Sequence, residues 1–219
     1  MRELVLIWGA GGHGKVVADL VRMSGHAVAG YADLDRAKQG AVVEPGGATV
    51  VISEADLVQL LDQGHALPCR ATAVALGLGD NEARLRAAQR AGRALMRALV
   101  HPAATVSESA QLGNGTVVFA GAVVNAAATI GAAVVINSGA VVEHDCSVGD
   151  GAHIAPGAVL TGGVSVGQGT LVGARAVVLP GIAIGADALV GAGAVVAGDV
   201  PSGVVAAGVP ARVLRQRAT

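Results

Sequence analysis

The sequence predicts a parallel β-helix over most of the second half of the chain and a smaller α/β unit before it. A period of six residues runs without a break from Val106 to Pro201. Each of its sixteen hexads begins with Val, Leu or Ile, and nine of them carry Ala at the fifth position. This period fits neither a continuous helix nor a half-buried strand. A short fixed repeat instead indicates one strand-and-turn unit stacked on itself, and hexapeptide repeats are typical of parallel β-helices.

Residues 1–100 alternate between apolar runs and amphipathic segments. We expect strands at residues 4–8, 26–31, 49–52, 71–76 and 94–100, and helices at residues 15–23, from 53 onward, and from 80 or 81 to about 92. Gly25 lies just past the first helix, and Ser53 with Asp56 three residues on resembles a capping box. Strand–helix alternation predicts a small parallel sheet of the Rossmann-like kind. We therefore expect two domains, residues 1–100 and 101–219.

The composition disfavours two classes of protein. The net charge is −1 and the aromatic residues are Trp8, Tyr31 and Phe119, so neither a basic surface nor a stacking platform for nucleic acid is present. The mean hydropathy is +0.60, but Gly, Asn, Thr or Ser interrupts the apolar residues too often for a membrane span of about 18 residues. No secretory signal pattern opens the sequence, and we expect a cytoplasmic protein. Cys146 occupies an inward fifth position, which predicts a buried thiol.

A glycine motif, Gly9-x-Gly11-x-x-Gly14, falls between the first strand and the first helix. Backbone N–H groups at such a turn hold anionic phosphate, so the motif indicates a nucleotide ligand. Asp33 follows 19 residues after Gly14, where an acidic residue bonds a ribose hydroxyl in dinucleotide folds. His13 lies inside the loop and is a candidate donor to phosphate or sugar. The alternative is a tight turn in which the glycines only allow close packing.

The β-helix repeat contains two histidines, His144 and His153. His144 is the only histidine at a third hexad position, and Glu143 and Asp145 flank it. Either carboxylate can fix the imidazole tautomer and raise its basicity, as a general base requires. The alternative is a polar residue on a solvated corner. His153 follows nine residues later, so we expect the two rings to lie apart within one chain.

The run at residues 136–146, INSGAVVEHDC, and the run HIAPGA at residues 153–158 resemble bacterial sugar O- and N-acetyltransferases. Those families include the sialic-acid O-acetyltransferases and the nucleotide-4-amino-sugar N-acetyltransferases. Further matching segments are GAGGHG at 9–14, GDN with Arg84 at 79–84, His-Pro at 101–102 and GVPAR at 208–212. The resemblance covers essentially the whole chain.

The resemblance implies a left-handed β-helix with three hexads in each triangular coil. Residues 18 apart then lie above one another, which places Ala126 below His144 and Gly162 above it. It also implies a homotrimer with active sites between neighbouring β-helices. Residues 1–100 would bind a nucleotide-activated amino sugar, and residues 101–219 would carry acetyl transfer from acetyl-CoA.

The resemblance also implies roles for individual residues. His144 matches the catalytic base and Asp145 the acid that increases its basicity. The acetyl-CoA contacts would be His153, Gly162, Ala174 and Ala192. The nucleotide-sugar contacts would be Gly11, Gly12, His13, Asp33 and Gly79, with Asn137 at the sugar. Leu34 departs from the second acid that often follows Asp33 in the family, which leaves the nucleobase open.

The function expected from these residues is N-acetylation of the 4-amino group of a UDP-, dTDP- or GDP-linked 4-amino-4,6-dideoxyhexose in bacterial glycan biosynthesis. A sialic-acid O-acetyltransferase is the first alternative. A γ-type carbonic anhydrase needs three imidazoles around one metal ion, and the β-helix offers His144 and His153 with His101 at its entrance. A non-catalytic sugar-nucleotide scaffold is the remaining alternative. We expect no metal in the acetyltransferase.

Overall fold

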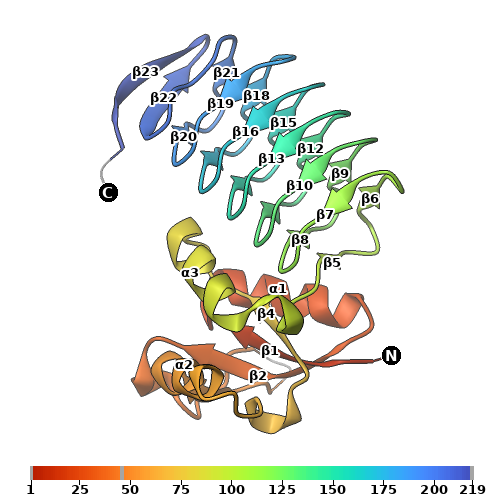
Figure 1. Cartoon of the computed structure of the whole chain (residues 1–219), viewed down its shortest axis with the longest axis vertical. Coiled ribbons are helices and arrows are strands. Elements are labelled where there is room, and N and C mark those ends of the chain that lie inside the picture. The colour runs from red at the N-terminus through yellow and green to blue at the C-terminus, as the bar shows by residue number, and fades with distance from the viewer. Residues whose placement is uncertain (1, 45–46, 218–219) are drawn as a thin grey trace. The chain divides into compact units, whose positions relative to one another are not determined.

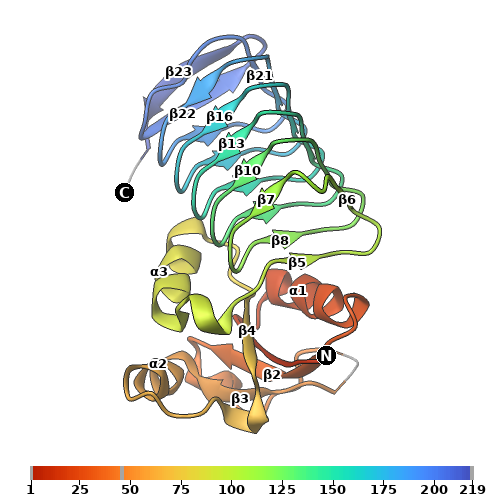
Figure 2. The ribbon, with the colours of Figure 1, turned by 45° about the vertical axis from the view of Figure 1, so that its right-hand side comes forward.

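The computed structural model describes residues 2–44 and 47–217. The chain divides into two compact units with the boundary between Leu99 and Val100. The first unit is an α/β fold and the second is a stack of short parallel strands, as the ribbons in Figures 1 and 2 show. In the described part of the chain, no helix is long and apolar enough to cross a membrane.

The first unit is built on the small parallel sheet that the sequence predicts. Its strands lie in the order β3-β2-β1-β4, and every pairing among them is parallel. Their bounds are β1 Leu4–Trp8, β2 Ala27–Asp33, β3 Val50–Ser53 and β4 Ala73–Leu76. The side chains of Val5–Trp8 in β1 and of all four residues of β4 are buried, which is why the predicted apolar runs mark these strands.

Two of the three helices of the first unit begin at the predicted capping residues. The helices are α1 Gly12–Met23, α2 Glu54–Asp62 and α3 Asn81–Ala91, and the 3-10 turns are η1 Arg36–Lys38, η2 Pro68–Arg70 and η3 Arg93–Leu95. The Ser53 side chain accepts from the Asp56 N–H, and the Asp80 carboxylate accepts from the Ala83 N–H, so both caps are confirmed. Helix α1 starts three residues before the predicted position, so Gly12, His13 and Gly14 form its first turn.

The predicted strand at residues 94–100 is wrong. Gly92 ends α3 with a φ of +73°, and η3 follows it. Only β5, Leu99–Val100, is a strand, and it joins the β-helix rather than the first sheet. The ladder continues beyond it, because the His101 N–H donates to the carbonyl of Val118 at 2.9 Å.

The second unit stacks two-residue strands into three parallel sheets. The sheet orders are β19-β16-β13-β10-β7, β21-β18-β15-β12-β9-β6 and, with the closing hairpin, β23-β22-β20-β17-β14-β11-β8-β5. The strands are β6 Thr105–Val106, β7 Gln111–Leu112, β8 Val117–Val118, β9 Val123–Val124, β10 Thr129–Ile130, β11 Val135–Ile136, β12 Val141–Val142, β13 Ser147–Val148, β14 His153–Ile154, β15 Val159–Leu160, β16 Ser165–Val166, β17 Leu171–Val172, β18 Val177–Val178, β19 Ala183–Ile184, β20 Leu189–Val190 and β21 Val195–Val196.

Each coil contains three hexads, as the resemblance implies. Val135 pairs with His153, and Ile136 pairs with Ile154, so partners in the ladder are 18 residues apart. The same spacing recurs between β12 and β15 and between β13 and β16. The left-handed sense of the coil stays a prediction.

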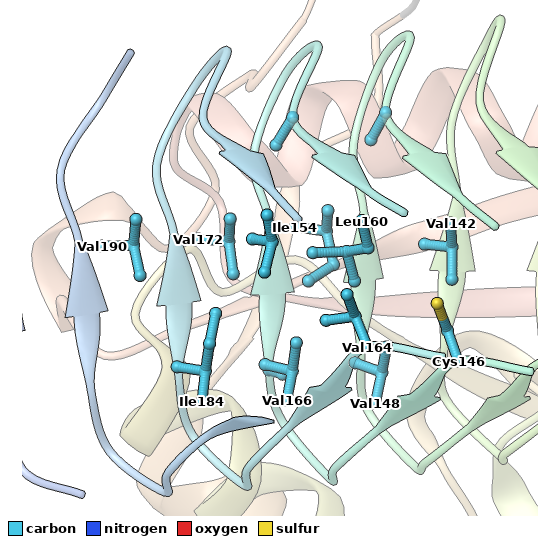
Figure 3. Close-up of a cluster of buried hydrophobic side chains, with 14 of the residues drawn as sticks. Val142, Cys146, Val148, Ile154, Leu160, Val164, Val166, Val172, Ile184 and Val190 are labelled. Atoms are coloured by element: carbon cyan, nitrogen blue, oxygen red, sulfur yellow. The ribbon is translucent and has the colours of Figure 1, made fainter. Parts of the chain in front are cut away.

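The interior of the β-helix is filled by the first and fifth positions of the hexads. Val142, Ile154 and Leu160 point inward beside the fifth-position residues Cys146 and Val164 (Figure 3). Cys146 is buried as predicted, and its thiol donates to the carbonyl of Thr161 at 3.2 Å. Burial of each large aliphatic side chain stabilises the fold by about 1.5–3 kcal/mol.

An antiparallel hairpin closes the stack. Its strands are β22 Val204–Gly208 and β23 Ala211–Gln216, and β22 extends the ladder by pairing with β20. β23 is therefore one of the two edge strands of the largest sheet, with β5 at the other edge.

Shortening one interior side chain tests this packing. Leu160→Ala should lower the free energy of unfolding by about 2–5 kcal/mol, because it leaves a cavity in a rigid stack. Leu34→Ala is the control, since 80% of that side chain's surface is exposed. Urea unfolding at equal protein concentration measures both variants. Equal stability of the two variants would contradict the assignment of Leu160 to the core.

Candidate active site

His144 and Asp145 are joined by a hydrogen bond at the corner that follows β12. The Nδ1 atom of His144 lies 2.8 Å from Oδ2 of Asp145. A carboxylate can only accept, so Nδ1 carries the proton and Nε2 keeps its lone pair. The His144 side chain is 63% exposed. The corner therefore presents an accessible imidazole whose free nitrogen can accept a proton.

The surroundings of His144 raise its pKa above the ordinary value. The hydrogen bond to Asp145 is the largest cause; slight desolvation opposes it, and the charges of Asp145 and Glu143 add to it. Glu143 is itself held by Asn125, whose Nδ2 donates to Oε2 at 2.8 Å. Both carboxylates thus favour the imidazolium that forms when His144 accepts a proton.

Asp145 occupies a backbone position that favours glycine. Its φ is +60°, in the left-handed region, and the equivalent fourth position of nearby hexads is Gly139, Gly151 or Gly157 with similar φ. Asp is among the few residues that adopt this conformation readily, because its short polar side chain bonds locally. Here the local bond is to the neighbouring imidazole. The turn chemistry of the coil therefore places the carboxylate beside the base.

Gly162 lies against the face of the His144 ring. A Cβ atom built on Gly162 would stand 2.7 Å from both Cε1 and Nε2 of the imidazole. The predicted small neighbour one coil above His144 is thus in close contact with it. Pro180 and Gly198 continue this column of third positions.

The other predicted acetyl-CoA and sugar residues belong to a different part of the coil. His153 lies on β14, where its Nε2 is 3.0 Å from Nδ2 of Asn137. Ala174 and Ala192 occupy the corners that follow β17 and β20, and the Gly193 N–H donates to the carbonyl of Ala174 at 2.8 Å. The structure therefore brings His153 and Asn137 together, and it groups Ala174 with Ala192 rather than with His144.

The outer glycines of the loop in the first unit are required for packing. Gly9 has a φ of +112°, and a Cβ there would lie 2.7 Å from the carbonyl oxygen of Gly77. A Cβ on Gly14 would overlap the Gly9 carbonyl oxygen, and one on Gly77 would lie 2.8 Å from the Cα of Gly14. These three glycines let the β1–α1 turn approach the end of β4, so the packing interpretation holds for them.

The inner glycines of the same loop have no such role. A Cβ on Gly11 or Gly12 would meet nothing within 4 Å. Helix α1 begins here without a side-chain cap and without an acidic residue in its first turn. The free N–H groups of a helix start attract anions, and the helix dipole adds to the attraction. Gly11 and Gly12 therefore leave open the space that a phosphate would fill.

Asp33 holds the glycine loop against the end of β2. Its Oδ2 accepts from the Ala10 N–H at 2.8 Å, and its Oδ1 accepts from the Asp35 N–H and Lys38 Nζ, each at 3.0 Å. Burial alone would raise the pKa of Asp33, but the hydrogen bonds from Asp35, Lys38 and Ala10 outweigh it and lower the pKa. The sequence motif did not indicate this structural role or the part played by Lys38.

Arg84 organises the turn that faces His13. Its guanidinium is fully buried, and it donates to the carbonyls of Leu78 and Gly79 and to Oδ1 of Asn81 at 2.8–3.3 Å. Burial lowers the pKa of Arg84 to about 10, against the charge of Asp80. Gly79 lies next to His13, since a Cβ on Gly79 would stand 3.8 Å from the His13 Cβ.

His13 is held in its neutral form. Burial, and then the charge of Arg84, lowers the pKa of His13 to about 4. A neutral imidazole at pH 7 can donate from one nitrogen and accept at the other. In the sequence, Arg84 stands out only as the last residue of the 79–84 motif. Its hydrogen bonds to the turn and its effect on the pKa of His13 were not predicted.

The described residues contain no group of three or more His, Cys, Asp or Glu side chains that could hold a metal ion. His101 Nδ1 accepts from the Ala103 N–H at 2.9 Å, which ties that ring to its own turn. Within the described residues of one chain, three imidazoles do not come together as a carbonic anhydrase site would require.

Comparison with known proteins assigns both units. The PglD N-terminal domain family matches residues 4–91, and the bacterial transferase hexapeptide family, in its six-repeat form, matches residues 127–162 and 163–198. No match was found among curated proteins.

Two solved proteins are similar over almost the whole chain. PerB from Caulobacter crescentus, in complex with CoA and GDP-perosamine, is 40% identical, with 96% of this chain and 97% of PerB covered and a TM-score of 0.84. The acetyltransferase domain of PglB from Neisseria gonorrhoeae FA1090 is 36% identical, with 97% and 100% covered and a TM-score of 0.85. The same domain in complex with acetyl coenzyme A is 35% identical, with 98% and 100% covered and a TM-score of 0.83.

The hydrogen bond between Asp145 and His144 can be tested without substrate. Asp145→Asn should lower the pKa of His144, because it replaces the carboxylate with a neutral amide and so removes the negative charge that favours the imidazolium. The pKa is measured by following the His144 ring proton by NMR against pH. Asp187→Asn is the matched control, since Asp187 also has a positive φ, +54°, at a fourth hexad position. A His144 pKa that is the same in all three proteins would show that Asp145 does not act on the ring.

Proposed function

The chain belongs to the hexapeptide-repeat sugar N-acetyltransferases, and from that premise we propose that it transfers an acetyl group from acetyl-CoA to the 4-amino group of a nucleotide-linked 4-amino-4,6-dideoxyhexose in bacterial glycan biosynthesis. The observation that carries this proposal is the exposed His144 paired with Asp145 at 2.8 Å. Support comes from PerB, which is 40% identical and was solved with CoA and GDP-perosamine, and from the PglB domain solved with acetyl coenzyme A.

In the proposed reaction the amine nitrogen of the sugar attacks the thioester carbonyl. Nε2 of His144 takes a proton from that nitrogen as the new C–N bond forms, and Asp145 stabilises the resulting imidazolium. The tetrahedral intermediate then collapses, the C–S bond breaks, and CoA leaves as its thiol after receiving the proton. Positioned general bases of this kind contribute about 10²–10⁴-fold in rate. The buried Cys146 takes no part, so the mechanism has no acyl-enzyme.

The developing oxyanion needs a hydrogen-bond donor near His144. Gly162 is in contact with the imidazole. We assign this role to the backbone N–H of Gly162, because the N–H groups of Gly163 and Val164 donate to the carbonyls of His144 and Thr161. We place the acetyl-CoA contacts at Gly162, Ala174, Ala192 and His153. Asn137, held beside His153, is assigned to the sugar.

The nucleotide is assigned to the start of α1. Gly11 and Gly12 leave space for the phosphates, while His13 and Gly79 line the same turn. Asp33 is assigned to the ribose. Its carboxylate oxygens have more lone pairs than the bonds from Ala10 and Lys38 use, so they can also accept from a ribose hydroxyl. A GDP-linked sugar is the first candidate, because GDP-perosamine is the ligand of the 40% identical PerB.

We further propose that the active protein is a cytoplasmic homotrimer of left-handed β-helices, with each active site between two neighbouring β-helices. A corner as exposed as that of His144 is suited to such a shared site. Light scattering of the purified protein measures the mass of the assembly directly.

Replacement of His144 tests the proposed base. His144→Ala should lower the rate of CoA release by about 1,000-fold, because proton removal from the attacking amine is lost. Acetyl-CoA binding, measured by calorimetry, should remain. The acceptors are GDP-, UDP- and dTDP-linked 4-amino sugars together with free and CMP-linked sialic acid. His65→Ala, at an exposed loop of the first unit, is the control and should keep full activity.

Near-normal turnover in His144→Ala would show that His144 is not the general base. A wild-type response to sialic acid alone would make the enzyme an O-acetyltransferase. The absence of both CoA release and CoA binding in the wild-type protein would favour a non-catalytic sugar-nucleotide scaffold.

A further inference from the structure

The backbone at position 162 does not itself require glycine. Gly162 stands at the third position of its hexad, and its φ lies outside the left-handed region. Six other hexads carry alanine at the same position of the coil. They are Ala120, Ala126, Ala132, Ala174, Ala186 and Ala192. A Cβ is therefore compatible with this turn, and the reason for glycine at 162 must lie in its surroundings.

One side chain accounts for the atoms that would crowd a Cβ at Gly162 most closely. The three atoms nearest to a Cβ built there are Cε1 and Nε2 of His144, both at 2.7 Å, and Nδ1 of His144 at 3.4 Å. At Gly131 and Gly167, which are second-position glycines, the nearest atoms include the backbone of the next coil. Those two glycines allow the coils to stack, whereas at Gly162 the three nearest atoms all belong to the imidazole.

The His144 ring is held from two sides. Asp145 binds its Nδ1 edge at 2.8 Å, and the Cα of Gly162 lies against its face. A methyl group at 162 would force the ring to turn about its χ angles. Because 63% of the side chain is exposed, the ring can turn toward solvent without disturbing the core. When the ring rotates in this way, it loses its hydrogen bond to Asp145.

We propose that Gly162 is a positioning residue, whose missing side chain lets the His144 imidazole lie flat on the next coil in the orientation that Asp145 binds. The inference rests on the proposed function, since it concerns the base of that reaction. It is separate from any contact that the Gly162 backbone makes with acetyl-CoA, because an alanine keeps the same N–H and carbonyl groups.

Gly162→Ala tests the proposal. The pKa of His144 should fall toward the ordinary histidine value of about 6.5, since the bond to Asp145 that raises it is lost while Glu143 remains nearby. The neighbouring coils add no other titratable group at this corner, where Ala126 lies below and Gly162 above. The kcat should fall by about 100-fold, as expected for a catalytic group displaced by about 1 Å. The melting temperature should stay near that of the wild type.

Two controls separate positioning from general disturbance. Gly198→Ala alters the same column of the coil where a Cβ meets nothing within 4 Å, and it should leave the melting temperature and the His144 pKa unchanged. In the His144→Ala background, Gly162→Ala should cause no further loss of kcat, because residues that act as a unit are not additive.

An unchanged His144 pKa and kcat in Gly162→Ala would overturn the proposal. If Gly162→Ala does not fold, the double variant decides: folding restored by His144→Ala supports a clash with the ring, and continued misfolding contradicts it. The NMR titration needs no substrate, so it judges this inference even if the wild-type protein transfers no acetyl group.

Discussion

The 18-residue register of the parallel ladders is the constraint on which the site depends. Ladder partners such as Val135 and His153 are one coil apart, so every hexad position forms a straight column through the stack. First and fifth positions point inward and supply the core. Third and fourth positions form the corners, and the register alone sets His144 against Gly162. A shift by one residue would move the inward residues outward and separate this pair.

Glycine serves three purposes in this chain, and the missing Cβ distinguishes them. Gly9, Gly14 and Gly77 have backbone atoms where a side chain would stand, so they allow the loop to pack. Gly11 and Gly12 face open space at the start of α1, which suits a phosphate. Gly162 represents a third case, because the atoms nearest to a Cβ there belong to His144, the proposed base. Asp145 completes that corner by adopting the left-handed backbone that its turn imposes.

The repeat predicted the β-helix core because a stacked coil selects the same residue type at each inward position. The capping residues of α2 and α3 were also predictable, since a cap depends on neighbours three residues away. The start of α1 was misplaced because Gly12 and Gly14 are poor helix formers. The strand at residues 94–100 was predicted too long and for the wrong sheet, because an apolar run specifies neither its exact ends nor its ladder partner. The hydrogen bonds by which Asp33 holds the glycine loop join it to Ala10 and Lys38. The contact between Gly162 and the His144 ring joins residues that are 18 positions apart. Such non-local contacts are absent from local sequence patterns.

The measurement that tests the central claim most directly is the pH dependence of kcat for acetyl transfer with both substrates saturating. His144 must be neutral to accept a proton, and Asp145 raises its pKa. The kcat should therefore be constant at high pH and fall with decreasing pH, with an inflection above the ordinary histidine value of about 6.5. A kcat that stays constant to pH 5 would contradict the assignment of His144 as the base.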